Sequence, residues 1–139
     1  MKYVFLILSL ISFIIAGEYE KDHSIVIDTK YKLMWQDDIE VMEYLETFIT
    51  AKVYCETLSL RGFQDWRVPN IYELLKIVDV TQKNAINKKF KYLKPNFYST
   101  SSVFQKNNNF IFGVDFKTGA IKMDKKTNNN YIRCVRDIL

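Results

Sequence analysis

The stretch GFQDWRVPNIYELL, residues 62–75, constrains the fold more than any other part of the chain. Gly62 follows an amphipathic run and suits the left-handed position that ends a helix. Pro69 disfavours helical backbone at the residue before it. Asn70, with Glu73 three positions later, has the pattern of a capping box at the start of the next helix. The sequence therefore predicts a rigid corner between two helices.

Trp66 is expected to be the buried centre of this corner. The charged residues expected to form caps and ion pairs around it are Asp65, Arg67, Glu73 and Arg133. Structural ion pairs are common, so this interpretation makes the corner a structural feature and not a catalytic site.

Residues 1–16 are expected to be a secretory signal peptide. A short positive start precedes an apolar run that is too short for a membrane-spanning helix, which needs roughly 20 residues. Cleavage after Ala16 fits this pattern, although Ile14 is bulkier than the residue usually found there, and an uncleaved anchor is the alternative. The mature chain, residues 17–139, would be one domain in the periplasm, secreted or at the cell surface. No transmembrane segment is expected after cleavage.

The composition limits which classes of ligand and which kinds of catalytic or metal site are expected. The net charge of +4 is too mild to argue for nucleic acid, but it suits acidic polysaccharide or anionic lipid surfaces. His23 is the one histidine, so a serine or cysteine nucleophile would have no convincing base. Zinc-binding spacing and glycine-rich phosphate loops are missing. We therefore expect no cofactor and no metal.

The two cysteines, Cys55 and Cys134, both follow the signal sequence. In an oxidising compartment an even pair indicates one disulfide. This disulfide would close a loop from residue 55 to residue 134, which would stabilise the fold by roughly 4 kcal/mol on the chain-entropy model.

Periodicity predicts an α+β domain, with two helices packed on a twisted antiparallel sheet. Leu33 and Trp35 alternate with Lys32, Met34 and Gln36, as in a half-buried strand. Gly119 is expected at the positive-φ position of a hairpin turn. The predicted helices span residues 41–60 and 71–80, and the predicted strands span residues 24–28, 31–36, 97–103, 110–116, 120–123 and 131–135.

The polar stretch of residues 81–95 allows two interpretations. It is either a solvated loop held by Ile86, Phe90 and Tyr92, or a basic patch with exposed aromatics that meets an acidic polymer. The candidate ligand-binding residues are Lys88, Lys89, Lys91 and Tyr92 in this loop, with Lys125 and Lys126 in a later hairpin.

Carboxylates leave two further possibilities open. Adjacent Asp37 and Asp38 suggest calcium, but no further oxygen ligands follow at loop spacing, so a turn or a helix cap is favoured. Asp38, Asp65, Glu73 and Asp115 could meet as a carboxylate pair for glycoside hydrolysis.

Five segments together resemble the Lcl C-terminal domain family of bacterial envelope proteins. The most specific part is a helix cysteine followed by G-x-x-D-W-R-x-P-x-x-x-E-L. The resemblance covers essentially the whole mature chain. Its segments are LMWQDD (33–38), AKVYCETLSLRGFQDWRVPNIYELL (51–75), YSTSS (98–102), VDFKTG (114–119) and YIRCVR (131–136).

The resemblance implies a C-type-lectin-like fold, related to sulfatase-modifying-factor domains, in which a cysteine of the first helix bonds one of the last strand. Tyr98 stands where the family usually has tryptophan, and Val68-Pro69-Asn70 stands where it has Leu-Pro-Thr. The sugar-reading motifs of calcium-dependent lectins are absent, so calcium-dependent binding is not implied. The residues assigned to the structural motif are Trp35, Asp65, Trp66, Arg67, Pro69, Glu73 and Arg133.

These observations favour a non-catalytic binding module of the cell envelope with an adhesion-type role. Its partner would be an acidic polysaccharide or an envelope protein. An enzyme, or an enzyme accessory, acting on envelope polymers is the alternative.

Overall fold

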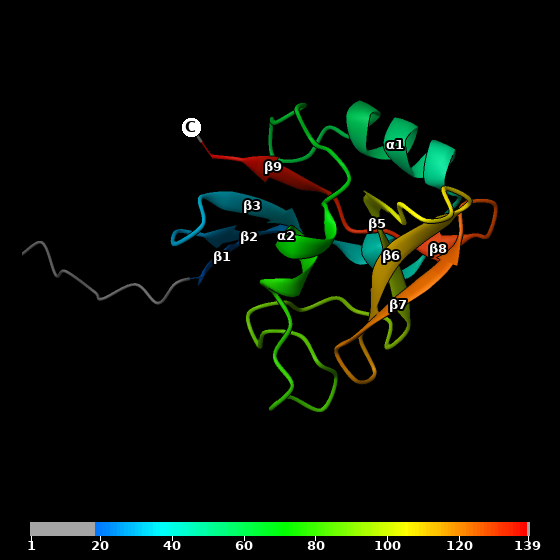
Figure 1. Ribbon diagram of the computed structural model, residues 1–139. Helices are drawn as coiled ribbons and strands as arrows, with labels where there is room; N and C mark the ends of the chain where they lie inside the picture. The colour runs from blue at the N-terminus through cyan, green and yellow to red at the C-terminus, as the bar shows by residue number, and fades with distance from the viewer. Residues whose placement is uncertain (1–18, 139) are drawn as a thin grey trace, which may run out of the picture.

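The computed structural model describes residues 19–138, so the expected signal peptide lies outside the described part of the chain. Within residues 19–138 the strands form two sheets (Figure 1). The four-stranded sheet is antiparallel and consists, in spatial order, of β1 (Tyr19–Asp22), β2 (Ile25–Asp28), β3 (Leu33–Gln36) and β9 (Val135–Asp137). The five-stranded sheet consists, in spatial order, of β4 (Leu45–Glu46), β8 (Asn130–Tyr131), β5 (Phe97–Val103), β6 (Phe110–Asp115) and β7 (Ala120–Lys125).

The expected single antiparallel sheet is therefore wrong in detail, although the α+β class is confirmed. In the larger sheet β5 pairs with β8 in the parallel direction, through Tyr98 and Tyr131. The last predicted strand, residues 131–135, divides between the two sheets. It divides because the chain crosses the core between β8 and β9, where residues 132–134 are fully buried.

The first predicted helix, residues 41–60, is also divided. A short 3-10 turn, Ile39–Met42, is capped by Asp38, and α1 extends only over Phe48–Thr57. Between them β4 pairs with β8, so hydrogen bonds to a distant segment replace helical ones. Leu45, which falls inside the predicted helix, consequently lies on β4 and is 49% exposed.

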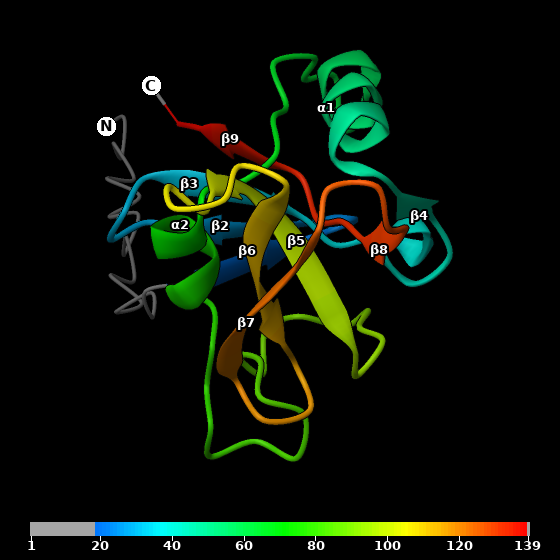
Figure 2. The same cartoon turned by 45° about the vertical axis from the view of Figure 1, so that its right-hand side comes forward.

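The second helix, α2, covers Ile71–Leu75 and not residues 71–80. Asn70 and Glu73 form the expected capping box at its start. Beyond its end the backbone turns to pair with the following loop, where Val78 bridges Ile86. Figures 1 and 2 show α2 where the two sheets meet and α1 along the outside near β8 and β9.

The corner of residues 62–75 differs at one point from the prediction. α1 ends before the corner, so Gly62 does not cap it. Arg61 and Gly62, at φ 55° and 80°, instead form a tight turn between Leu60 and Phe63, which exchange both backbone hydrogen bonds. Positive φ at both central residues is what such a turn requires.

Two clusters of buried side chains make up the core. The first lies between the sheets and α2, and it includes Trp35 and Tyr98. The second lies beneath α1 and surrounds the Cys55–Cys134 disulfide, which the structure contains. β3 runs between the two clusters and is buried at all four positions, so it is not the half-buried strand that was predicted. Both of its faces are covered because Met34 packs in the second cluster.

Candidate functional site

Three adjoining depressions cross the face formed by α1, β5 and the connection from β7 to β8. The first, of about 170 Å³, lies between α1 and β5 and includes Phe48 in its lining. The second, of about 370 Å³, shares Phe48 with the first. The third, of about 300 Å³, shares Lys126 and Thr127 with the second. We call the first the α1–β5 pocket and the other two together the basic groove. The residues lining the basic groove are Thr47, Phe48, Ile49, Asn109, Phe110, Lys125, Lys126 and Thr127.

Backbone hydrogen bonds hold three distant segments together at the basic groove. The Phe48 amide donates to the Lys126 carbonyl at 3.0 Å, and the Lys126 amide donates to the Asn109 carbonyl at 2.9 Å. Thr47 and Thr50 form a capping box that starts α1 at this point. The Lys126 ammonium group lies 4.8 Å from the centre of the Phe48 ring, which is a cation–π contact.

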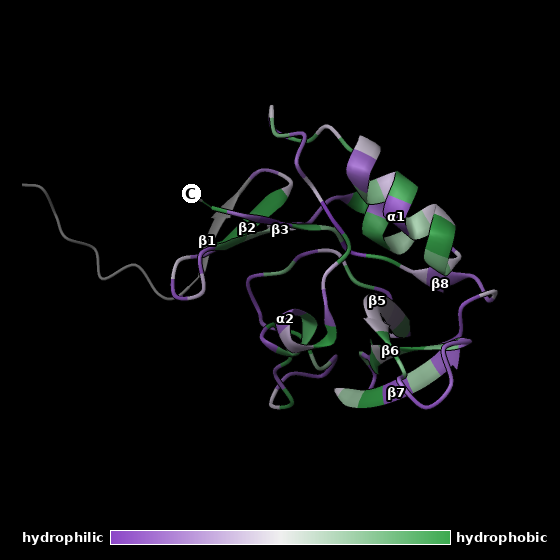
Figure 3. Cartoon of the chain, turned by 45° about the horizontal axis from the view of Figure 1, so that its top comes forward, coloured by the Kyte–Doolittle hydropathy of each residue, from purple (hydrophilic) through white to green (hydrophobic). Residues whose placement is uncertain are grey.

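The basic groove carries uncompensated positive charge. Lys125 and Lys126 form no ion pair with any residue among 19–138. The nearest acidic residue in sequence, Asp124, is occupied because its oxygens accept hydrogen bonds from the side-chain amides of Asn128 and Asn130. β7 is the edge strand of its sheet, and it passes from hydrophobic residues at its start to hydrophilic residues at its end (Figure 3). The groove therefore combines two free ammonium groups with aromatic walls.

The structure does not bring the six predicted ligand-binding residues together. The hairpin turn before β7 lies against the start of the loop of residues 81–95, because a Cβ on Gly119 would lie 3.2 Å from Ala85. Lys126 lies beyond the opposite end of β7, and a strand of six residues spans about 17 Å. Figures 1 and 2 show the loop of residues 81–95 and the connection from β7 to β8 at separate places.

Buried side chains and backbone hydrogen bonds hold the loop of residues 81–95 against the core. Ile86 and Phe90 are buried, as the first interpretation of this loop expected. The amides of Lys91 and Tyr92 both donate to the Asp37 carboxylate, at 2.9 and 3.1 Å. Of the four predicted ligand-binding residues in this loop, Tyr92 is half-buried and Lys88, Lys89 and Lys91 are exposed.

Arg133 does not belong to the Trp66 corner, which corrects the sequence-based assignment. Its side chain is fully buried and donates to the Gln36 carbonyl at 2.6 Å and to Asp37 at 3.1 Å. It also donates to the Tyr92 carbonyl. Asp37 and Arg133 therefore fasten the loop to the core. Sequence reasoning assigned Asp37 to a turn and missed this pair, although the position of Arg133 between two buried residues was a usable signal.

The other charged residues of the corner form the expected ion pairs. Arg67 bonds both Glu73 oxygens at 2.7 Å, and Asp137 at 3.0 Å. Arg136 bonds Asp65 at 2.6 Å. Burial alone would raise the pKa of Glu73, but the hydrogen bonds from Arg67 and the Asn70 amide hold that pKa below its ordinary value.

Buried aromatics complete this framework. Trp66 is 2% exposed, and its indole donates to the Phe63 carbonyl at 2.9 Å. Trp35 is fully buried, and Pro69 is buried too. The Tyr98 hydroxyl donates to the Val41 carbonyl at 2.6 Å and accepts from the Lys94 amide at 3.1 Å. Trp66, Trp35 and Tyr98 belong to the two core clusters, and none of them lines the basic groove.

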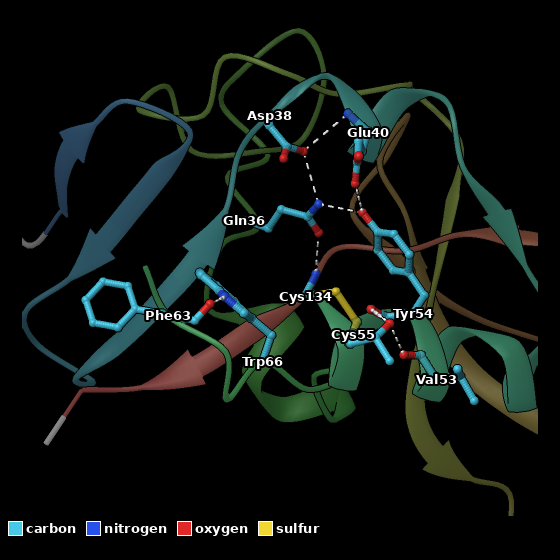
Figure 4. Close-up of a disulfide and its surroundings, with 10 residues drawn as sticks. Gln36, Asp38, Glu40, Val53, Tyr54, Cys55, Phe63, Trp66 and Cys134 are labelled. Carbon is cyan, nitrogen blue, oxygen red and sulfur yellow. Dashed lines mark hydrogen bonds between the residues drawn. A yellow bond between two sulfur atoms is a disulfide. The ribbon is translucent and has the colours of Figure 1, made fainter. Parts of the chain in front are cut away.

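A polar network lies beside the disulfide (Figure 4). The Gln36 amide group donates to Asp38 at 3.0 Å and to the Tyr54 hydroxyl at 2.8 Å, and the Tyr54 hydroxyl donates to Glu40. The Cys134 amide donates to the Gln36 side-chain oxygen. Burial raises the pKa of Asp38, which caps the 3-10 turn as expected.

The four carboxylates considered for hydrolysis each bind a different partner. Asp65 and Glu73 bind separate arginines, and Asp115 binds Lys122 at 2.7 Å. The hydrogen bonds to Arg136 and to Lys122 hold the pKa values of Asp65 and Asp115 below their ordinary range. None of the four lines the α1–β5 pocket or the basic groove. Among residues 19–138, no three His, Cys, Asp or Glu side chains are grouped to hold a metal ion.

No helix in the described part of the chain has the length and apolar character to cross a membrane.

Comparison with known proteins supports one assignment. No curated protein matches the sequence. The model of the Lcl C-terminal domain matches residues 24–136, which is most of the chain and includes both cysteines and the Trp66 corner. The chain therefore belongs to the Lcl C-terminal domain family.

Proposed function

We propose that this chain is an exported, non-catalytic binding module of the cell envelope that recognises an acidic glycan through the basic groove. The observation that carries the proposal is that two ammonium groups without an ion-pair partner, those of Lys125 and Lys126, lie in one groove with the rings of Phe48 and Phe110. An adhesion-type role at the cell surface or in the periplasm follows from this reading.

The chemistry of the groove suits an acidic sugar. A sugar ring has apolar C–H faces that pack on aromatic side chains, and its carboxylate or sulfate groups pair with lysine. Each exposed ion pair contributes only about 0.2–1 kcal/mol. Binding by a single module is therefore weak, depends strongly on salt, and gains affinity when several modules engage one polymer.

The disulfide supports export, because structural disulfides persist in oxidising compartments and are rare in reducing ones. The family membership supports a domain of C-type-lectin-like type, and such a fold hosts many functions. The ligand class therefore rests on the groove and not on the fold.

The test is a glycan array probed with the purified exported protein at low and at physiological salt, with and without calcium. The array contains sulfated, carboxylated and neutral polysaccharides. The informative variant is Lys125→Gln/Lys126→Gln. Lys88→Gln/Lys89→Gln is its matched control, because it removes the same charge from the distant loop.

We expect sulfated or carboxylated polymers to bind at low salt without calcium. The groove variant should weaken binding by about 2- to 30-fold, from two lost ion pairs of 0.2–1 kcal/mol each, and the loop variant should bind like the wild type. Binding only to neutral sugars, and only with calcium, would overturn the proposal. Equal losses in both variants would show non-specific attraction to positive charge. Release of new reducing ends from a bound polymer would identify an enzyme instead.

A further inference from the structure

The α1–β5 pocket contains a hydroxyl group that no protein atom satisfies. Ser99 lies on β5, lines the pocket and is only 2% exposed. Its hydroxyl makes no hydrogen bond with any residue in the range 19–138. The hydroxyl oxygen is also not among the polar atoms sealed away from solvent, so the pocket is its route to a partner. A buried polar group in this position is satisfied by water or by a ligand.

The pocket is apolar on one side and polar on the other. Phe48, Ala51 and Val68 supply apolar surface, whereas Ser99 and Ser101 supply hydroxyl groups along β5. The register of β5 against β6 shifts between Ser99 and Val103. The Ser101 hydroxyl donates to the Pro69 carbonyl at 3.4 Å, so Ser99 carries the hydroxyl of this wall that has no protein partner. A ligand with an apolar face and polar edges matches this division.

Charges at the mouth of the pocket are already compensated. Arg67 is bonded by Glu73 and Asp137. Lys52 and Glu56, which also line the pocket, are exposed and lie 3.9 Å from one another. An anion would therefore compete with carboxylates that are in place, and the pocket is suited to an uncharged group.

We propose that the α1–β5 pocket is a specificity subsite that holds one uncharged, hydroxylated sugar residue of the glycan bound in the basic groove. Phe48 lines both the pocket and the groove, so the two sites adjoin and one glycan chain is the natural occupant of both. Its volume of about 170 Å³ is below the 300–1,000 Å³ of sites for drug-sized ligands, and suits a single ring. The inference rests on the proposed function only in taking the sugar to be part of that glycan.

The experiment measures amide chemical shifts of the isotope-labelled, exported protein by NMR. The probes are neutral monosaccharides (glucose, galactose, mannose, fucose and N-acetylglucosamine), added at about 10 mM because a single-ring contact has a Kd near 1 mM or weaker. Cyclohexanol at the same concentration is the control for a purely apolar cavity. The variants are Ser99→Ala, which removes the hydroxyl, and Ala51→Leu, which fills the pocket. Lys126→Gln is the control in the basic groove.

We expect at least one monosaccharide to shift the amides of residues 99–101 without dependence on salt. Ser99→Ala should weaken that sugar about 2- to 12-fold, the equivalent of one net hydrogen bond, and Lys126→Gln should leave it unchanged. Ser99→Ala keeps the test valid even if Ala51→Leu disturbs the fold. Equal shifts with cyclohexanol, or no sugar shift while acidic polysaccharide binds the wild type, would overturn the subsite and leave the groove intact. Sugar binding without any polysaccharide binding would uphold the pocket and overturn the proposed function.

Discussion

Opening the Cys55–Cys134 disulfide should cost a large part of the stability of this domain. The bond joins α1 to the segment before β9 across a sequence separation of 79 residues. On the chain-entropy model, a loop of that length lowers the entropy of the unfolded chain by an amount worth about 4.5 kcal/mol at 25 °C. Native domains are stable by only about 5–15 kcal/mol. Replacing both cysteines by alanine should therefore remove roughly 30% or more of the total.

The assay is urea unfolding of the wild type, the two single alanine variants and the double variant, followed by far-UV circular dichroism. Each single variant opens the same loop, so the three losses should agree within about 1 kcal/mol and should not add. The slope with urea should rise, because an unfolded chain without the cross-link exposes more surface. Alkylation and mass spectrometry of the exported wild type should detect no free thiol. A double variant within about 1 kcal/mol of the wild type would refute the entropic reasoning.

Three further perturbations test the framework. Trp66→Ala should lower the free energy of unfolding by about 3–5 kcal/mol, because the indole is buried, and an unchanged melting temperature would contradict this. Arg133→Met should lower the free energy of unfolding by about 3–5 kcal/mol, because it leaves the Asp37 carboxylate buried without its cation. An unchanged melting temperature would show that the Asp37–Arg133 pair makes no net contribution to stability. The pKa of Glu73 is lower in the folded state than in the unfolded state, where it is near 4.5. The stability that the Glu73 carboxylate contributes is therefore present above that pH and is lost as the pH falls further. Urea midpoints at pH 7 and pH 3 should show the difference in stability between wild type and Glu73→Gln shrinking in acid, and a wider difference at pH 3 would contradict this.

Local signals were sufficient for features built from neighbouring residues. The capping box at Asn70 and Glu73, the positive φ of Gly119 and the cap at Asp38 each depend on a few consecutive residues. The burial of Trp66 also followed from its own size and setting. In these cases the preference is local, so the tertiary structure had only to agree with it.

Features that depend on a distant partner were not predicted correctly. The apolar spacing of residues 41–60 fits a helix, but the pairing of β4 with β8 interrupts it. Arg133 was placed at the wrong corner because its partner, Asp37, is 96 positions away. The separation of the six predicted ligand-binding residues into two groups, by the length of β7, likewise had no local signal.

The candidate site shows the same division. Lys125 and Lys126 were identified from charge, and they line the basic groove. The walls were missed, because Phe48 and Phe110 reach the groove from different elements and neither residue is unusual in the sequence. Ser99 also carried no signal, since a serine in a β-prone strand is ordinary until its hydroxyl is found in a pocket without a partner.

The sequence by itself determined the class of fold, the family, the pairing of the only two cysteines and the local turns and caps. These follow from short-range backbone preferences, from hydrophobic content and from counting. The tertiary structure alone decided that there are two sheets, that β3 is buried on both faces and which lysines share a groove. The reason is physical: strand partners and pockets are chosen by hydrogen bonds and burial between segments far apart in the chain, and many such arrangements are compatible with one local pattern.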